Sequence, residues 1–491
     1  MSHITIVGLG PGSAGDLTRE AWQVLESAGE VWLRTLHHPV VADLPPHTTV
    51  RAFDEIYEQA ETFAAVYAEI AQQVLELGRR EAGVVYAVPG HPLVGEATVT
   101  QILATSEHSG VPVRIVDGLS FVEPSLTALG IDALEGLQVF DALDLLPLYH
   151  PPLNPDLPVL IAQVYSRAVA SQLKLVLMNQ YDDEHPTVLI DGAGTSRERL
   201  RRLPLYQIDR EETTPLTTLY VAPLPAVTSF EGFQETIARL RSPDGCPWDR
   251  EQTHQTLRTN LLEEAYEVLE AIDLDDANAL REELGDLLLQ IVLHAQIAVE
   301  TGEFHMTEVI AQIDAKLKRR HPHVWGGLDV ADVGEVITNW EAIKRRERVD
   351  EGAAERSLLD GIPKALPALA QAVSYVDRAA RIGFDQIEAD GVWVNLPKRL
   401  AKLVDAWEAE LDAVTGVETE QGQEWFGDAL LVLVDWARRQ SIDPESTLRQ
   451  ANQCFANRFR IVEAAAQQQG IALEDLTLDE IKRLWRDRDM A

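Results

Sequence analysis

The chain has 491 residues and a formal net charge of −37 at pH 7, from 42 Lys and Arg against 79 Asp and Glu. A chain of this length predicts two to four domains, each able to bury a core. Its acidity argues against nucleic-acid binding through a basic surface and against binding to anionic membranes. Anionic small molecules remain open as substrates, because a metal ion or a local basic pocket is enough to bind them.

The cysteines and the apolar runs bear on where the protein works. Cys246 and Cys454 are the only cysteines, which excludes a disulfide framework and a cysteine-rich zinc site and fits a reducing cytosol. The N-terminus reaches glycine too early for a signal peptide, and no apolar run is long enough to span a membrane. We therefore expect a soluble cytoplasmic protein that binds neither nucleic acid nor membranes.

The first 224 residues alternate short β-branched runs with helical stretches, which predicts an α/β domain with a largely parallel sheet. Three glycine-containing loops follow predicted strands: GLGPG at residues 8–12, PGHP at 89–92 and DGLSF at 117–121. We expect these loops at the carboxyl ends of the strands, where open α/β sheets bind ligands. The first loop lacks both the spacing of a dinucleotide fingerprint and the Lys of a P-loop. The proline-punctuated residues 223–228 predict a linker.

From Phe230 onward, apolar residues recur every three or four positions, which predicts an all-helical region. Glu264 and Glu267 share one face of a predicted helix, and Glu283 and Asp286 share a face of the next. The pair Glu267 and Glu283 and the pair Glu264 and Asp286 are both centred on Asp275, in the predicted turn DLDDAN. An antiparallel hairpin would therefore bring all four carboxylates together. Facing carboxylates repel one another unless a cation lies among them, and hard oxygen ligands select Mg²⁺ or Mn²⁺.

Two further features accompany this cluster. Glu263 lies beside it and is a candidate further ligand or base for water. The basic segment KLKRRHPHVWG, residues 316–326, suits a polyphosphate in so acidic a chain. The alternatives are an acidic face solvated by water and an ordinary charged helix end before Pro322.

A second helical block repeats the pattern at a shift of 142 residues, which carries Gly285 and Asp286 onto Gly427 and Asp428. The same shift replaces the three glutamates by Ala406, Ala409 and Trp425. We interpret this block as a scaffold that packs on the first block or on a dimer mate.

The helical half resembles the MazG family of nucleoside triphosphate pyrophosphohydrolases. The match rests on GCPWDREQTHQTLRTNLLEEAYEVLEAID, LREELGDLLLQIVLHAQIA and KLKRRHPHVWG, and it covers residues 229–345 closely, with the family motif EExxE…ExxD complete. The resemblance implies an all-α fold, a homodimer, Mg²⁺ held by the acids, and cleavage of an NTP to NMP and pyrophosphate. The second block has CFANR in place of the family's KFxRR-like segment, so we expect one site, in the first block. The implied roles are catalytic for Glu263, metal binding for Glu264, Glu267, Glu283 and Asp286, and nucleotide binding for Lys316, Arg319, Arg320, Trp340 and Lys344.

The first half resembles the tetrapyrrole (corrin/porphyrin) methylase family over residues 1–224. GLGPG, PGHP and DGLSF match its S-adenosylmethionine-binding segments, with His91 in place of the usual loop Asp. LRTLHHP and QVYSR match the version fused to MazG in YabN-like proteins. Arg34, His37 and His38 are candidates to bind an acidic tetrapyrrole, against the alternative that the two histidines lie on the surface. The resemblance implies a cofactor site lined by Leu9, Pro89, Gly90, His91, Val94 and Ser120.

These features predict a multidomain protein. An α/β methylase-like domain (1–224) precedes an all-α MazG-type region with two repeats, intact at 229–348 and degenerate at 358–491. The leading hypothesis is an Mg²⁺-dependent NTP pyrophosphohydrolase fused to an S-adenosylmethionine-dependent tetrapyrrole methylase. The alternatives are a methyltransferase with the helical region as accessory, a methylase-like domain that binds its cofactor without turnover, and a non-catalytic nucleotide sensor.

Overall fold

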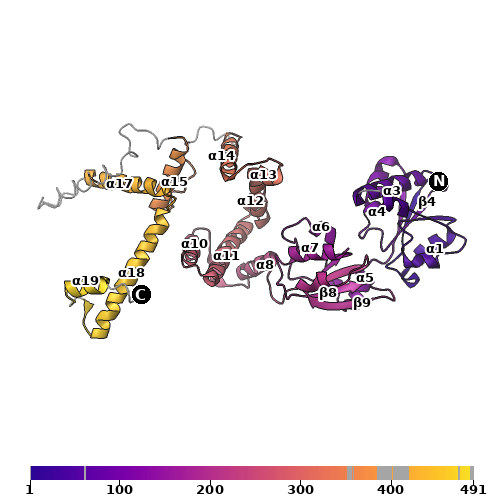
Figure 1. Ribbon diagram of the computed structural model, residues 1–491, viewed down its shortest axis with the longest axis horizontal. Coiled ribbons are helices and arrows are strands. Elements are labelled where there is room, and N and C mark those ends of the chain that lie inside the picture. The colour runs from indigo at the N-terminus through magenta and orange to yellow at the C-terminus, as the bar shows by residue number, and fades with distance from the viewer. Residues whose placement is uncertain are drawn as a thin grey trace. The chain divides into compact units, whose positions relative to one another are not determined.

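The computed structural model describes residues 2–59, 62–350, 357, 359–383, 401, 420–473 and 476–486 (Figure 1). Its contacts divide the chain into two compact units, Met1–Ala311 and Gln312–Ala491. Helix α12, Met306–Arg320, crosses this division, which falls inside the span 229–348 expected for the first MazG domain. The domain limits therefore stay a prediction.

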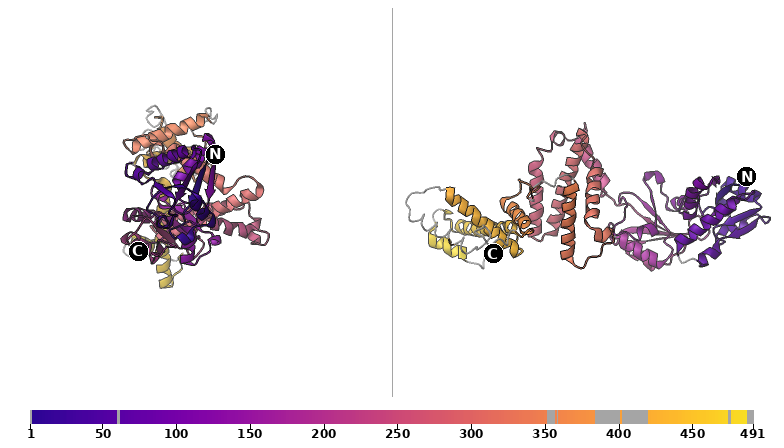
Figure 2. Two further views of the ribbon diagram at one scale, coloured as in Figure 1. Left: turned by 90° about the vertical axis from the view of Figure 1, so that its right-hand side faces the viewer. Right: turned by 90° about the horizontal axis from the view of Figure 1, so that it is seen from above.

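An all-parallel sheet opens the chain, in the order β3-β2-β4-β1-β5. Strand β4 of this sheet is labelled in Figure 1. Helices cover both of its faces, so all five residues of β1 are buried. Ile4 and Ile6 share a core with Ile70 of α3, whereas Val7 packs in a second core with Leu25 of α1. These elements form the indigo part of the ribbon in Figure 2. Burial on both faces is typical of parallel sheets, and the predicted parallel α/β fold is confirmed here. The elements are β1 Ile4–Gly8, α1 Arg19–Ser27, β2 Glu30–Leu33, β3 Thr49–Ala52, α2 Asp54–Gln59, α3 Phe63–Gly78, β4 Val84–Val88, α4 Ala97–Ser109 and β5 Val113–Val116.

A second, mixed sheet follows in the order β6-β7-β10-β8-β9. Only β6 and β7 pair in parallel; the other described pairs are antiparallel, and β8 and β9 form a hairpin with no helix between them. Leu173 of α7 joins the core on one face, and Leu129 of α5 packs on the other. The alternation of strands and helices did not distinguish this sheet from the first. The elements are α5 Val122–Leu129, β6 Gln138–Asp141, α6 Ala142–Leu145, β7 Val159–Ala162, α7 Arg167–Leu177, β8 Pro186–Asp191, β9 Arg199–Pro204 and β10 Thr217–Val221.

The predicted helical hairpin is confirmed. Helix α10, Arg258–Asp273, and helix α11, Ala277–Thr301, pack against each other across a short turn (Figure 1). In that turn Asp275 adopts a left-handed φ of 55°, which Asp tolerates, and Asp276 caps α11 by accepting from the N–H groups of Asn278 and Ala279. Helix α8, Phe230–Arg241, shares a small apolar core with α11, and α9, Pro247–Glu251, follows it.

One described helix, α11, is long and apolar enough to cross a membrane by length and composition alone. The sequence reading expected no such run. Of its most apolar stretch, 33% is buried inside the protein, and the helix packs on α8 and α10. A helix in the core of a soluble protein can have the same length and composition, because it needs an apolar face for packing.

The second unit is helical in its described part. Helix α15 contacts α17 and α18, and Val462 and Ala466 of α18 form a core with residues before and on α19. Gly427 and Asp428 lie on α17, whereas Ala406, Ala409 and the side chain of Trp425 lie outside the described residues. The helices are α13 Pro322–Trp325, α14 Val333–Asp350, α15 Ala368–Ala380, α17 Glu420–Arg439, α18 Pro444–Gln469 and α19 Leu478–Arg486.

Candidate functional site

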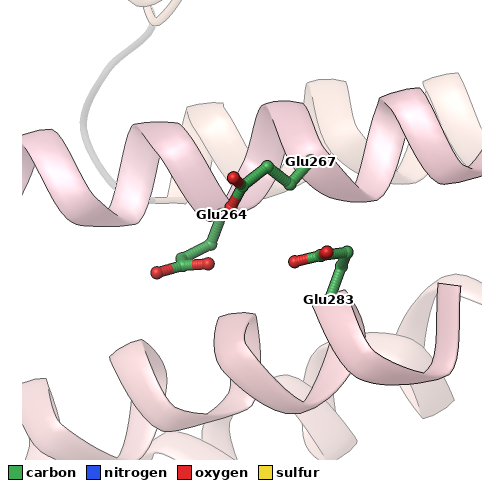
Figure 3. A group of neighbouring side chains, drawn as sticks. All are labelled: Glu264, Glu267 and Glu283. Carbon is green, nitrogen blue, oxygen red and sulfur yellow. The ribbon is translucent and has the colours of Figure 1, made fainter. Parts of the chain in front are cut away.

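Three glutamates meet between α10 and α11. Glu264 and Glu267 extend from α10, and Glu283 faces them from α11 (Figure 3). One carboxylate oxygen from each lies within 4.8 Å of the other two. The one-turn spacing on α10 and the hairpin turn together produce this geometry, because the turn returns Glu283 to the level of Glu267.

The electrostatics of the group are those of crowded like charges. Partial burial, the charge of Asp286 and the neighbouring Glu267 raise the pKa of Glu264. Desolvation and the charges of Glu267 and Asp286 raise the pKa of Glu283. Among the described residues, no Lys, Arg or His forms an ion pair with these three glutamates. The carboxylates are therefore poised to gain from a cation.

The other two predicted site acids, Asp286 and Glu263, do not belong to this group of three. Asp286 lies outside the group of three, although its charge acts on both Glu264 and Glu283. Glu263 is exposed on α10 and the structure does not bring it into the group. Successive helix residues point about 100° apart, which separates Glu263 from its neighbour Glu264.

A cationic and aromatic cluster forms within the second unit, between the end of α12 and α14. Arg320 lies over the Trp340 ring with its Cζ 5.9 Å from the centroid, and Nζ of Lys344 lies 3.5 Å from the same centroid. Glu347 bridges Arg319 and Arg320, with closest contacts of 2.6 and 2.7 Å. Hydrogen bonds from both guanidinium groups hold the pKa of Glu347 at about 2.

Four of the five predicted nucleotide-binding residues thus come together, while Lys316 is exposed and lies earlier on α12. Sequence reasoning missed Glu347. The available signal was its position three residues after Lys344, on the same side of one helix.

The α/β half contains a cavity of about 420 Å³. Five of the six predicted cofactor residues line it: Pro89, Gly90, His91, Val94 and Ser120. Leu9 does not; its side chain is 1% exposed within the core below the loop, where its backbone N–H donates to the carbonyl of Val88. The backbone of this loop reaches the cavity one residue later, at Gly10.

The three glycine loops meet at the carboxyl ends of β1, β4 and β5, as expected. Gly10 and Gly90 exchange backbone hydrogen bonds of 3.2 and 2.9 Å. A Cβ on Gly8 would lie 2.6 Å from the carbonyl oxygen of Gly90, and a Cβ on Gly118 would lie 2.5 Å from the same oxygen. The glycines therefore permit a close approach of three backbone segments that no side chain would allow.

His91 and His38 are both fixed beside these loops. Nδ1 of His91 accepts from the N–H of Leu93, and its Nε2 lies 3.5 Å from Oδ1 of Asp117. His38 is buried, its Nε2 lies 3.0 Å from the carbonyl oxygen of Gly10, and burial lowers its pKa. The carbonyl can only accept, so Nε2 carries the proton and Nδ1 is left as a buried acceptor without a partner among the described residues.

The cavity is also lined by a buried ion pair between Arg34 and Glu96, with the ring of Tyr67 beside Arg34. The sequence pointed to Arg34 and to His38, whose surface alternative is wrong; His37 is exposed. It missed Glu96 and Tyr67, which carry no motif.

Two family profiles match the chain. The family described as "MazG nucleotide pyrophosphohydrolase domain" matches residues 252–325, and "Tetrapyrrole (Corrin/Porphyrin) Methylases" matches residues 3–209. The protein of Bacillus subtilis (strain 168) called "Uncharacterized protein YabN" is 39% identical over 494 residues, covering 99% of this chain and 98% of the relative.

Two further comparisons cover one half each. The "Nucleoside triphosphate pyrophosphohydrolase/pyrophosphatase MazG" of Thermotoga maritima is 38% identical over 256 residues, covering 52% of this chain and 94% of the relative. The solved structure "Crystal structure of the methyltransferase CobJ" is 18% identical with a TM-score of 0.36, covering 45% of this chain and 95% of that chain. The profile matches and the full-length Bacillus relative confirm both resemblances and their order along the chain. The chain belongs to the YabN-like family of proteins, in which a tetrapyrrole methylase domain precedes a MazG nucleotide pyrophosphohydrolase domain.

Proposed function

We propose that the MazG part of this chain hydrolyses nucleoside triphosphates to nucleoside monophosphate and pyrophosphate. The observation that carries this proposal is the convergence of Glu264, Glu267 and Glu283 within 4.8 Å across the α10–α11 hairpin. The relative from Thermotoga maritima carries the same activity in its name. The protein is thus an enzyme of the hydrolase class.

Mg²⁺, or Mn²⁺ in its place, fits this donor set. All the donors are carboxylate oxygens, which hard divalent cations prefer. The raised pKa values of Glu264 and Glu283 report a repulsion that a cation among them would relieve. We assign Glu264, Glu267, Glu283 and Asp286 as its ligands. The bound ion would supply positive charge to the phosphate oxygens during cleavage.

The remaining residues act on water and on the nucleotide. Glu263, adjacent to the ligands and exposed, is the proposed base that takes a proton from the attacking water. Arg319 and Lys316 contact the phosphates, and Trp340 with Lys344 contacts the nucleotide. The second helical block serves as a scaffold, because Ala406 and Ala409 stand where carboxylates would be needed.

The α/β half is proposed to bind S-adenosylmethionine and to transfer its methyl group. The fit is supported by the cavity of about 420 Å³, by glycine loops whose backbone can approach a ligand, and by the unpartnered Nδ1 of His38 at its edge. Methyl transfer from a sulfonium depends mainly on positioning, so the absence of a strong base in the loops does not count against it. A tetrapyrrole is the acceptor that the family description names.

Association into a homodimer is also proposed. Apolar side chains on α10 and α11 are well exposed, among them Leu262 at 53% and Ile272 at 54%. Such a face suits a second copy of the chain. Light scattering is expected to give a dimer mass, and a monomer would overturn this part. We place the protein in the cytoplasm, without nucleic-acid or membrane partners.

Pyrophosphate release tests the main proposal. A panel of NTPs and dNTPs would be incubated with wild type, Glu264→Gln and the control Glu235→Gln, an exposed glutamate on α8. Release is expected to need Mg²⁺, to fall at least about 100-fold in Glu264→Gln, and to be unchanged in the control. Nucleotide binding without hydrolysis would favour a sensor, and methylation without hydrolysis would favour a transferase with the helical region as accessory.

A further inference from the structure

The Arg34–Glu96 pair is a charged group inside an otherwise mainly apolar cavity. Arg34 follows β2 and Glu96 precedes α4, so the two come from segments 62 residues apart. Their side chains are 23% and 3% exposed, and both line the cavity that the glycine loops border. Burying two charges is costly unless their hydrogen-bonding capacity is satisfied.

That capacity is only partly used. Nε of Arg34 donates to the hydroxyl of Tyr57 at 2.9 Å, and Nη1 donates to Oε1 of Glu96. Nη2 makes no hydrogen bond with any described residue. Oε2 of Glu96 is buried without a well-aligned hydrogen bond among the described residues, although the nearby Thr98 hydroxyl helps to stabilise this carboxylate. The pair therefore presents an unused donor on a cation beside an unused acceptor on an anion.

The surroundings favour the charged form of Arg34 and disfavour the charged form of Glu96. Burial opposes the charge of Arg34, yet the Glu96 carboxylate raises the pKa of that guanidinium above its ordinary value. Burial raises the pKa of Glu96, and Arg34 opposes that shift. The other titratable groups that line the cavity are His38, His91, Tyr67 and Tyr165.

A ligand group of matching chemistry must offer an anion to Arg34 and a cation to Glu96. The Glu96 carboxylate would repel a ligand that carries only a carboxylate, and the Arg34 guanidinium would repel a ligand that carries only an ammonium group. The surrounding residues 1–224 hold 29 Asp and Glu against 13 Lys and Arg, so the domain does not favour anions. A zwitterion brings no net charge and satisfies both free groups.

We propose that the Arg34–Glu96 pair forms a subsite of the cavity for the α-amino acid end of a ligand, with its carboxylate at Arg34 and its ammonium group at Glu96. The inference rests on the proposed function of this half, because S-adenosylmethionine itself carries an α-amino acid end. An acceptor with such an end has the same chemistry. The experiment separates the two sources.

The first arm uses calorimetric titration of the full chain with S-adenosylhomocysteine and with 5′-methylthioadenosine, the same thioether nucleoside without the amino acid end. Wild type is expected to bind the first at least about tenfold more tightly than the second. Glu96→Gln is expected to remove this preference and to leave the affinity for 5′-methylthioadenosine unchanged. Glu30→Gln is the matched control. Glu30 lies on β2 of the same domain, pairs with Arg51 and Arg80, and does not line the cavity.

The second arm addresses an acceptor. Wild type saturated with S-adenosylhomocysteine would be titrated with a panel of free L-amino acids, and binding that disappears in Glu96→Gln places an acceptor in the subsite. Equal affinity for both nucleosides, together with no amino acid binding, would overturn the subsite while leaving the cofactor proposal standing. Failure of wild type to bind either nucleoside would overturn both. If Glu96→Gln does not fold, the difference in wild-type affinity between the two nucleosides still tests the proposal. Arg34→Gln is a second variant, which is expected to lose the same preference for S-adenosylhomocysteine.

Discussion

The carboxylate of Glu347 on α14 holds the guanidinium of Arg320 on α12, with its Oε2 2.7 Å from Nη2 and 3.1 Å from Nε. Its other oxygen accepts from Nε of Arg319 at 2.6 Å. The two arginines differ in access, since the side chain of Arg319 is 55% exposed and that of Arg320 is 16% exposed. Arg319 therefore keeps outer N–H groups free for the proposed phosphate contact, while Arg320, Glu347 and Trp340 hold the cluster in place.

Replacing the two arginines should separate these roles. Arg319→Gln is expected to raise the KM for the nucleotide by about tenfold with an unchanged melting temperature, because it loses a charge-assisted contact and little packing. Arg320→Gln is expected to lower the melting temperature, by about 2–4 °C for each kcal/mol lost. Steady-state kinetics and calorimetry measure both. Lys318→Gln is the control, because Lys318 pairs with Asp314 on the same helix, and equal KM effects from Arg319 and Arg320 would contradict the division.

Removing one acid from the group of three glutamates should stabilise the protein when no metal is present. Desolvation and neighbouring carboxylates raise the pKa of Glu283. At neutral pH its ionised carboxylate therefore destabilises the folded chain relative to the unfolded chain. Glu283→Gln is expected to raise the melting temperature in EDTA and to lose most of the increase that Mg²⁺ gives wild type. Differential scanning calorimetry with and without Mg²⁺ checks this. A variant less stable than wild type in EDTA would argue for an ordinary structural role.

Two stacked histidines predict an acid-sensitive contact between the segment before α10 and helix α11. Nδ1 of His254 lies 2.8 Å from Nδ1 of His294, so one nitrogen must donate and the other must accept. Desolvation and the charge of His254 lower the pKa of His294 from its ordinary 6.5, and Glu303 lies 3.9 Å from the far side of His254. The unfolded chain then binds more protons below about pH 6.5, so stability is present above that pH and is lost as the pH falls.

The measurement is urea unfolding at pH 5, 6 and 7. Wild type is expected to lose stability toward pH 5, and His294→Gln is expected to flatten that decline, because an amide can pair with His254 without titrating. An unchanged pH dependence in the variant would assign the decline to other groups.

A methyl group on Gly118 should displace the glycine loops that border the α/β cavity without touching the helical region. Its Cβ would lie 2.5 Å from the carbonyl oxygen of Gly90, a backbone atom that cannot swing aside. Gly118→Ala is expected to abolish S-adenosylhomocysteine binding while pyrophosphate release is retained. Gly29→Ala is the control, since a Cβ there meets nothing within 4 Å. Cofactor binding of wild-type strength in Gly118→Ala would show that the loops can part.

The acidic site was predictable because its geometry is local. Helical periodicity places Glu264 and Glu267 on one side, and their spacing about Asp275 sets the level at which Glu283 returns. Only one hairpin turn separates the three glutamates. The glycine loops were predictable for the same kind of reason, because each directly follows a strand of one parallel sheet.

The partners of the charged residues were not predictable. Glu96 meets Arg34 across 62 residues, and Glu347 meets Arg319 across 28. No periodicity links such positions, because each contact depends on how separate elements pack. The same limit explains Leu9, which belongs to a functional motif yet turns its side chain into the core.

The sequence by itself determined the family, the order of the two halves, the acidic hairpin and the loss of acids in the second block, since these follow from motifs and short-range spacing. Only the tertiary structure decided that the second sheet is mixed, that His38 is buried while its neighbour His37 is exposed, and that a charged pair lies inside the α/β cavity. Burial and pairing depend on which distant segment lies alongside a residue, and that information appears only when the chain is folded.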